Sequence, residues 1–107
     1  MQRIRFFHGS SIDSATIARI KEHIGKDAKV MVLLDSHHSR DHVLNELKAY
    51  TPLVTRHSYI IVNDTQWGEP LRAVEDFLTA NDEFVADATV DRYAVSCAHG
   101  GFLKRVK

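Results

Sequence analysis

Residues 29–39 read KVMVLLDSHHS, an apolar run that ends on a carboxylate. Polar and apolar residues do not alternate in the run, which is typical of a strand buried on both faces within a parallel sheet. Asp35 directly follows this predicted strand. Because ligands of open α/β sheets bind outside the carboxyl ends of the strands, Asp35 lies where such proteins carry out their chemistry.

A second strand is predicted over residues 58–63, and it ends in the same way. The segment Tyr59-Ile60-Ile61-Val62 runs directly into Asn63 and Asp64. Neighbouring parallel strands have their carboxyl ends at one edge of the sheet. We therefore expect Asp35, Asn63 and Asp64 to face one small volume, which makes this edge the candidate functional site.

The composition limits the class of protein. The chain has 107 residues, the size of one domain, and its 14 Lys and Arg residues balance 14 Asp and Glu residues. A formal net charge of zero provides no long-range field to attract nucleic acid or an anionic membrane. The apolar run of residues 30–34 is far shorter than the ~20 residues of a membrane span. Since no signal-peptide pattern opens the chain and Cys97 is its single cysteine, we expect a cytoplasmic protein without disulfides.

Helices are predicted where apolar residues recur at helical spacing after an initial strand over residues 3–7. The expected helices run from Asp13 or Ser14 to Gly25, from Ser39 to Tyr50 or Thr51, and from Pro70 to about Asn81. Ser39 is the expected N-cap of the second helix, and Pro52 is expected to end it.

The end of the chain changes period. Residues 84–88 and 93–97 are short strand candidates, and the segment after Gly101 is an apolar-basic tail. Cys97 is expected to be a small core residue. The order β-α-β-α-β-α-β-β predicts an α/β three-layer sandwich, whose sheet is Rossmann-like and mainly parallel with an antiparallel edge hairpin.

Several separate blocks of the sequence resemble one protein family. The blocks are LDSHHS at 34–39, HVLNEL at 42–47, Tyr50, PLV at 52–54, Ser58-Tyr59, Asp64-Thr65, Gly9-Ser10-Ser11 with Asp13, and GGFL at 100–103. They are similar to the carboxyl-terminal half of the cephalosporin hydroxylase-like, rhamnosyl O-methyltransferase-like family. The resemblance covers nearly the whole chain. It implies the S-adenosylmethionine-dependent methyltransferase fold, of which this chain would supply strands three to seven and lack the first two.

The resemblance also implies a magnesium site. Proteins of this family hold Mg²⁺ at the carboxyl ends of strands four and five, and Asp35 and Asp64 match the metal-binding positions. The usual family pair is Glu-Asp, whereas this sequence has Asn63 before Asp64, as in catechol-type methyltransferases. An amide oxygen still binds a hard cation but removes one negative charge, so weaker metal binding is expected. We interpret His38 as a substrate-side residue or general base near the metal, and the family implies a sugar-like or catechol-like hydroxyl acceptor.

The cofactor site is incomplete by the same comparison. The family holds S-adenosylmethionine on a glycine-rich loop after strand one and an acidic residue after strand two, and this sequence has neither segment. Its five glycines form no G-x-G. The residues that match the loop near the adenine are Gly9, Ser10, Ser11 and Asp13. We therefore predict a single partial methyltransferase-like domain over residues 1–107 that does not methylate a substrate by itself.

The missing strands leave a gap in the predicted sheet. Either the strand at residues 3–7 pairs with the strand at 29–34, or a second molecule fills the gap, since an open central edge invites aggregation. That molecule would be a homodimer partner or a separate amino-terminal half. An alternative function is thus a non-catalytic dimerisation or interaction module that uses the open sheet edge.

The same residues allow other interpretations. Asp35 and Asp64 would also serve as caps of the helices that follow them. His38 and His42 have the spacing of zinc ligands on a helix, although no third soft ligand is near in the sequence. A receiver-type domain phosphorylated on Asp35 is disfavoured because its acidic pair and its lysine are missing. Trp67 either lines a substrate pocket or packs on the third helix.

Overall fold

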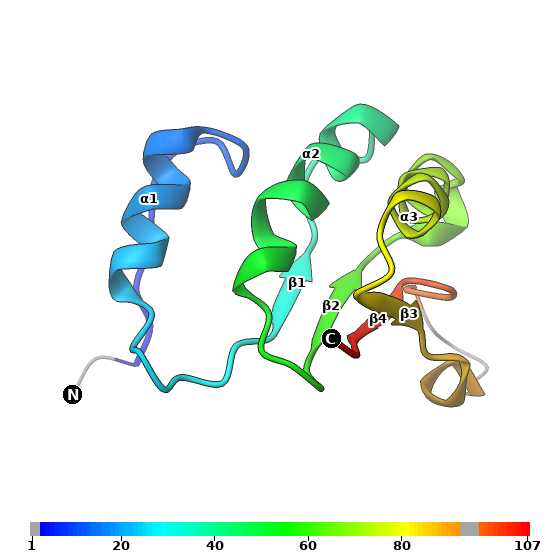
Figure 1. Ribbon diagram of the computed structural model, residues 1–107. Helices are drawn as coiled ribbons and strands as arrows, with labels where there is room; N and C mark the ends of the chain where they lie inside the picture. The colour runs from blue at the N-terminus through cyan, green and yellow to red at the C-terminus, as the bar shows by residue number, and fades with distance from the viewer. Residues whose placement is uncertain (1–2, 93–96) are drawn as a thin grey trace.

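The computed structural model describes residues 3–92 and 97–107, and its arrangement of helices and strands is shown in Figure 1. The α-helices are α1 (Ser14–His23), α2 (Arg40–Tyr50) and α3 (Glu69–Ala80). The strands are β1 (Val32–Leu34), β2 (Tyr59–Val62), β3 (Phe84–Ala86) and β4 (Phe102–Arg105). Short 3-10 helices follow some of these elements, and they are η1 (Thr51–Leu53), η2 (Thr65–Trp67) and η3 (Ala88–Arg92). The α-helices lie where the apolar spacing predicts them.

The strands form one mixed sheet in the order β1-β2-β4-β3. β1 and β2 are parallel, with Val32 opposite Ile60 and Leu34 opposite Val62. β4 is antiparallel to both of its neighbours, β2 and β3. The α/β class and the partly parallel sheet are therefore confirmed.

β4 occupies a position in the sheet that the sequence did not predict. Residues 102–105 were expected only as a tail, yet they form a strand between β2 and β3, and Leu103 is fully buried there. Gly101 allows the chain to approach β2 closely, because a Cβ at this position would lie 2.3 Å from the carbonyl oxygen of Val62. The antiparallel partner of β3 is thus β4.

The predicted strand at 93–97 has a different outcome. Its residues 93–96 lie outside the residues that the structure describes. Cys97 is exposed, so its predicted position in the core is wrong. The neighbouring Ala98 is buried instead.

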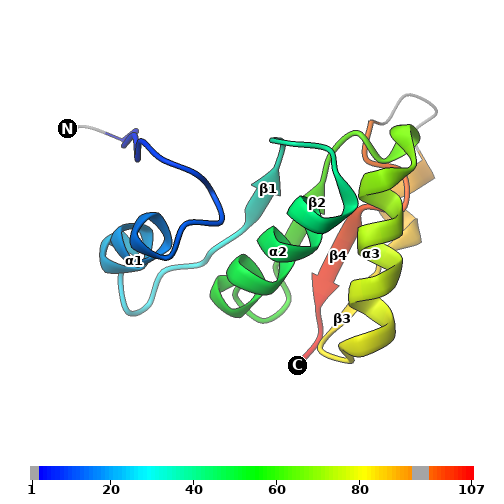
Figure 2. The same ribbon diagram turned by 90° about the horizontal axis from the view of Figure 1, so that it is seen from above.

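The core lies between the sheet and the pair α2 and α3, which pack against each other over one face of it (Figure 2). Its most buried side chains include Leu47, Ile60, Val62, Val74 and Leu103. The N-cap of α2 is confirmed, because Ser39 Oγ accepts a hydrogen bond from the backbone N–H of His42 at 3.3 Å. The Arg40 guanidinium on α2 pairs with Asp76 on α3 and holds the pKa of that carboxyl below its usual range.

β1 is shorter and more exposed than the apolar run suggests. Leu34 is buried toward α2, whereas Leu33 on the opposite face of the strand is 60% exposed. The prediction of a strand buried on both faces is therefore wrong, because helices cover β1 on one face only within the described structure. The three-layer arrangement is accordingly not confirmed.

Residues 3–7 do not form a strand, contrary to the prediction. Phe6 is 93% exposed, and the described sheet contains no partner for this segment. A strand depends on the backbone hydrogen bonds of a neighbour, so a short apolar segment by itself is not enough. The predicted pairing of residues 3–7 with the strand at 29–34 is wrong for the same reason.

α1 lies beyond the β1 edge of the sheet (Figure 2). Ile17 and Ile20, two residues of its predicted apolar stripe, are partly buried against the core. None of the helices in the described part of the chain has the length and apolar character needed to span a lipid bilayer.

Candidate functional site

The carboxyl ends of β1 and β2 lie side by side, as the sequence predicts. The backbone N–H of Asn63 donates to the carbonyl of Leu34 at 3.0 Å, which continues the parallel pairing by one residue beyond the strands. The Asn63 side chain reaches the same neighbour, since its Nδ2 donates to Asp35 Oδ1 at 3.2 Å. Asp64 follows directly. The predicted meeting of Asp35, Asn63 and Asp64 at one sheet edge is therefore present.

His38 joins this group from the loop between β1 and α2. Its Nε2 lies 2.9 Å from Asp64 Oδ2. One ligand atom each from Asp35, His38 and Asp64 can be chosen so that all lie within 4.8 Å of one another. Asp35 and His38 are exposed and Asp64 is partly buried, so solvent reaches the group. The arrangement could hold one cation between two carboxylates and an imidazole.

Asn63 contacts this group through its amide nitrogen rather than its oxygen. In this orientation it is a hydrogen-bond donor that fixes Asp35, and its oxygen does not face the carboxylates. Its predicted role as a metal ligand remains a prediction. The sequence could not indicate which end of the amide faces Asp35, because that depends on the neighbouring charges.

Asp64 has an unusual backbone conformation, with a φ of 57° in the left-handed region. Asp tolerates this conformation better than most residues because its short side chain can bond locally. The turn begins η2, in which the N–H of Trp67 donates to the carbonyl of Asp64 at 3.1 Å. It places the Asp64 carboxylate between His38 and Gln66, whose Nε2 donates to Oδ1 at 3.5 Å.

His42 is separate from the cation-sized group. Its Nε2 lies 3.3 Å from Ser11 Oγ and 3.2 Å from Ser36 Oγ, and it is not a member of the group formed by Asp35, His38 and Asp64. The described residues thus provide no zinc site that pairs His38 with His42. His37 is exposed and contacts Ser39, in agreement with its predicted position in solvent.

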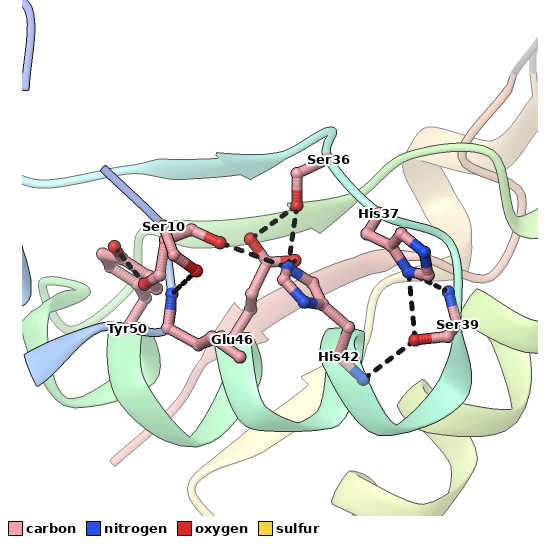
Figure 3. A network of polar contacts seen from close by, with 9 residues as sticks. Ser10, Ser36, His37, Ser39, His42, Glu46 and Tyr50 are labelled. Atoms are coloured by element: carbon pink, nitrogen blue, oxygen red, sulfur yellow. Dashed lines mark hydrogen bonds and ion pairs between the residues drawn. The ribbon is translucent and has the colours of Figure 1, made fainter. Parts of the chain in front are cut away.

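Glu46 is a functional residue that the sequence interpretation missed. It is buried on α2, and its Oε2 accepts a hydrogen bond from Ser36 Oγ at 2.9 Å (Figure 3). Its other oxygen, Oε1, has no hydrogen-bond partner among the described residues. The available signal was its place beside Leu47 on the apolar stripe of the helix, where a carboxylate is uncommon.

The residues predicted to lie near the adenine form the turn before α1. Asp13 is the residue before the helix, and its Oδ2 accepts a hydrogen bond from Thr16 Oγ1 at 3.4 Å. Gly9 has a φ of 143° and lies so close to Thr16 that a Cβ would be 2.5 Å from Thr16 Oγ1. Ser10 Oγ accepts from the N–H of Ile12 at 3.4 Å. The cofactor-binding role of Gly9, Ser10, Ser11 and Asp13 remains a prediction, and their contacts are explained by local structure.

Ser11 nevertheless connects this turn to the sheet edge. It lines a cavity of about 360 Å³ together with Asp35, Ser36, Glu46 and Tyr50. Tyr50 donates from its hydroxyl to the Ser11 carbonyl at 2.7 Å. Burial, and then the charge of Glu46, raise the pKa of the Tyr50 phenol. Trp67 is exposed in η2 and does not line this cavity.

Comparisons with known proteins agree with the resemblance. The sequence model of the rhamnosyl O-methyltransferase/CmcI family matches residues 1–106. The chain is 32% identical over 120 aligned residues to the rhamnosyl O-methyltransferases of Mycobacterium tuberculosis (strain ATCC 25618 / H37Rv) and Mycobacterium bovis (strain BCG / Pasteur 1173P2). These matches include 95% of this chain and 47% of each relative, so the chain spans about half the length of the curated relatives. No solved structure gives a significant match.

The fold and the site define a class before they define a family. The class is that of α/β proteins with polar side chains gathered at the carboxyl ends of parallel strands, where such sheets bind ligands. The family match over nearly the whole chain then gives the particular assignment, and this chain belongs to the rhamnosyl O-methyltransferase/CmcI family.

Proposed function

We propose that this chain is the metal-binding half of an O-methyltransferase-like domain, partial over residues 1–107, in which Asp35 and Asp64 hold a divalent cation. The observation that supports this proposal is the approach of their carboxylates and His38 to within 4.8 Å at an exposed sheet edge. Two carboxylates at this separation repel each other and attract a cation. Mg²⁺ is the expected ion because it prefers hard oxygen ligands.

Asn63 would complete the oxygen ligands after a rotation of its amide. Its nitrogen now faces Asp35, as suits a carboxylate without a cation. A cation between the carboxylates would favour the amide oxygen instead, and a rotation about one side-chain bond exchanges the two. One amide replaces one charge, so we expect modest affinity for the ion.

His38 would act as the general base on the acceptor hydroxyl. Imidazole is a poor ligand for Mg²⁺, and its hydrogen bond with Asp64 orients the ring at the mouth of the site. A bound Mg²⁺ would polarise the hydroxyl and orient it toward the methyl donor. His38 would then take up the hydroxyl proton.

The substrate and the cofactor follow from the family. The relatives are named rhamnosyl O-methyltransferases, so we propose S-adenosylmethionine as methyl donor and a sugar-like hydroxyl, rather than a catechol, as acceptor. The chain has no G-x-G, and the polar side chains of residues 10–13 bond within their own turn or to α2, so the cofactor site would be incomplete and the chain inactive by itself. The single cysteine and the zero net charge favour the cytoplasm and no nucleic-acid partner.

A second candidate function is an interaction module, through either dimerisation or pairing with a separate amino-terminal half. The specific observation that favours it is the position of β1, which lies at the end of the described strand order with Leu33 exposed.

Magnesium titration of the purified chain by calorimetry tests the metal proposal. We expect saturable Mg²⁺ binding, with an affinity at least tenfold lower in Asp35→Asn and Asp64→Asn. Asp27→Asn is the matched control, because Asp27 is an exposed carboxylate in the turn between α1 and β1. Binding that is absent, or equal in all four proteins, would remove the metal site. If His38→Gln abolishes Mg²⁺ binding, then His38 is a ligand and its role as base is lost.

A further inference from the structure

β1 has one free edge. Within the described residues it pairs with β2 alone, and it is the first strand in the sheet order. Since Leu34 bonds to the β2 side through its carbonyl, the backbone N–H and C=O of the alternate residue Leu33 face the free edge. Met31 and Leu33 are 61% and 60% exposed. Unprotected apolar edges of this kind are templates for pairing with another strand.

The free edge opens into the cavity of about 360 Å³ described above. One wall is β1 itself, and the others come from Ser11, Ser36, Glu46 and Tyr50. The cavity therefore joins exposed backbone groups of a strand to a mainly apolar hollow beneath α2.

Glu46 gives this hollow a specific chemical demand. The residue is 2% exposed, and one of its carboxylate oxygens is satisfied by Ser36. The other oxygen, Oε1, has no hydrogen bond within the described structure, and His42 Nε2 stands 3.7 Å away, beyond hydrogen-bond reach. Leaving a buried carboxylate oxygen unpaired is costly, so the site is complete only when a donor arrives from outside.

We infer that a β-strand from a separate polypeptide segment pairs with the free edge of β1 and presents an N–H or O–H donor to Glu46 Oε1. This inference deepens the interaction role proposed above and does not depend on the metal site. A small molecule could fill the cavity, but it would not satisfy the row of backbone groups along β1. A strand satisfies both.

A second copy of this chain fits the edge less well. Two copies of β1 paired about a two-fold axis would bring two Glu46 carboxylates toward one seam, where like charges repel. The relatives supply a better candidate, because more than half of their length lies outside the match to this chain. A segment of that origin is free to carry the donor.

Co-expression tests the inference with the intact chain and a defined probe. The probe is the part of the M. tuberculosis rhamnosyl O-methyltransferase that lies outside the match. We expect the two to purify as a 1:1 complex, with the Leu33 amide protected from hydrogen exchange. Leu33→Asp should reduce the yield of complex at least tenfold. Val85→Asp is the matched control, because Val85 is an exposed apolar residue on β3, the opposite edge strand.

Glu46→Gln separates the proposed contact from a merely structural role. In the free chain it removes a buried charge with one unpaired oxygen, so thermal stability should stay equal or rise. In the complex it weakens the bond to the incoming donor, so the dissociation constant should increase about tenfold. A variant that destabilises the free chain and leaves the dissociation constant unchanged would overturn the role of Glu46.

Other outcomes would overturn the pairing itself. These are the absence of a complex, or a complex equally sensitive to Leu33→Asp and Val85→Asp. A concentration-dependent dimer of the chain in light scattering, lost in Leu33→Asp, would make a second copy the occupant and also contradict the inference. Asp35→Asn should leave the complex intact, so a failed metal proposal is distinguishable from a failed pairing.

Discussion

At the scale of single residues, the chain places charge where its partners are few. Asp64 turns through a left-handed conformation to face His38, and Asp35 is held by the amide of Asn63. Glu46 is buried with one oxygen unpaired. These positions are where the chain spends stability on features that packing alone would not select, which is typical of functional sites.

Tyr50 allows a test at this scale. Its hydroxyl donates to the Ser11 carbonyl and ties α2 to the turn before α1. Tyr50→Phe removes this bond while keeping the ring, so we expect the free energy of unfolding to fall by about 1 kcal/mol at neutral pH. Urea denaturation measures the change. An unchanged midpoint would show that the bond does not form in solution.

The same variant has a defined pH dependence. The pKa of the Tyr50 phenol is raised above its ordinary value of 10.0 by burial and by Glu46, so the folded state favours the neutral phenol. The contribution of Tyr50 to stability is therefore complete below pH 10.0 and is lost as the pH rises through the folded pKa. The wild type should lose stability more steeply than Tyr50→Phe in this alkaline range. Parallel curves would contradict the assignment.

At the scale of elements, apolar runs were clearer about where a strand forms than about what covers it. The residues of β1 are apolar on both faces, but the described helices cover only one of them. β4 was missed because Lys104 and Arg105 make its sequence resemble a charged tail, although Leu103 is fully buried. The helices were predicted well because spacing, caps and Pro52 all indicate the same boundaries.

Gly101 tests how closely β4 must approach β2. A Cβ there would lie 2.3 Å from the Val62 carbonyl oxygen, which forces the backbone to move. We expect Gly101→Ala to cost about 1–3 kcal/mol of unfolding free energy, the range for an overpacked site. Gly25→Ala is the control, because the nearest atom to its added Cβ is 4.0 Å away. Equal stability of the two variants in thermal denaturation would contradict the packing of β4.

At the scale of the whole molecule, the chain forms a core but not a complete methyltransferase-like sheet. The core lies under α2 and α3, while β1 ends the sheet with an unpaired edge. The chain spans about half the length of its relatives. Its catalytic competence would therefore depend on what completes the sheet.

An activity assay tests this dependence. The purified chain with Mg²⁺, S-adenosylmethionine and a rhamnose-containing acceptor should give no methylated product by mass spectrometry, because the glycine-rich cofactor loop is missing. Heat-inactivated chain is the control for background transfer. Turnover by the isolated chain above this background would contradict the proposed inactivity and would require a cofactor site made from these residues alone.

The sequence by itself determined the local features of this protein. Apolar spacing with Ser39 and Pro52 determined α2, and residues 32–35 and 59–64 determined two strands that each end in polar side chains. The motif blocks determined the family, which the comparisons confirm. These features depend on short-range backbone preferences and on residue identity, which a linear reading contains.

Only the tertiary structure decided which segments meet. It placed residues 102–105 inside the sheet, left residues 3–7 without a partner, and brought His38 into the group with Asp35 and Asp64. It also left Glu46 buried with an oxygen unpaired beside the free edge of β1. Pairing, burial and the satisfaction of polar groups depend on contacts between residues distant in the chain, and residue order alone does not fix those contacts.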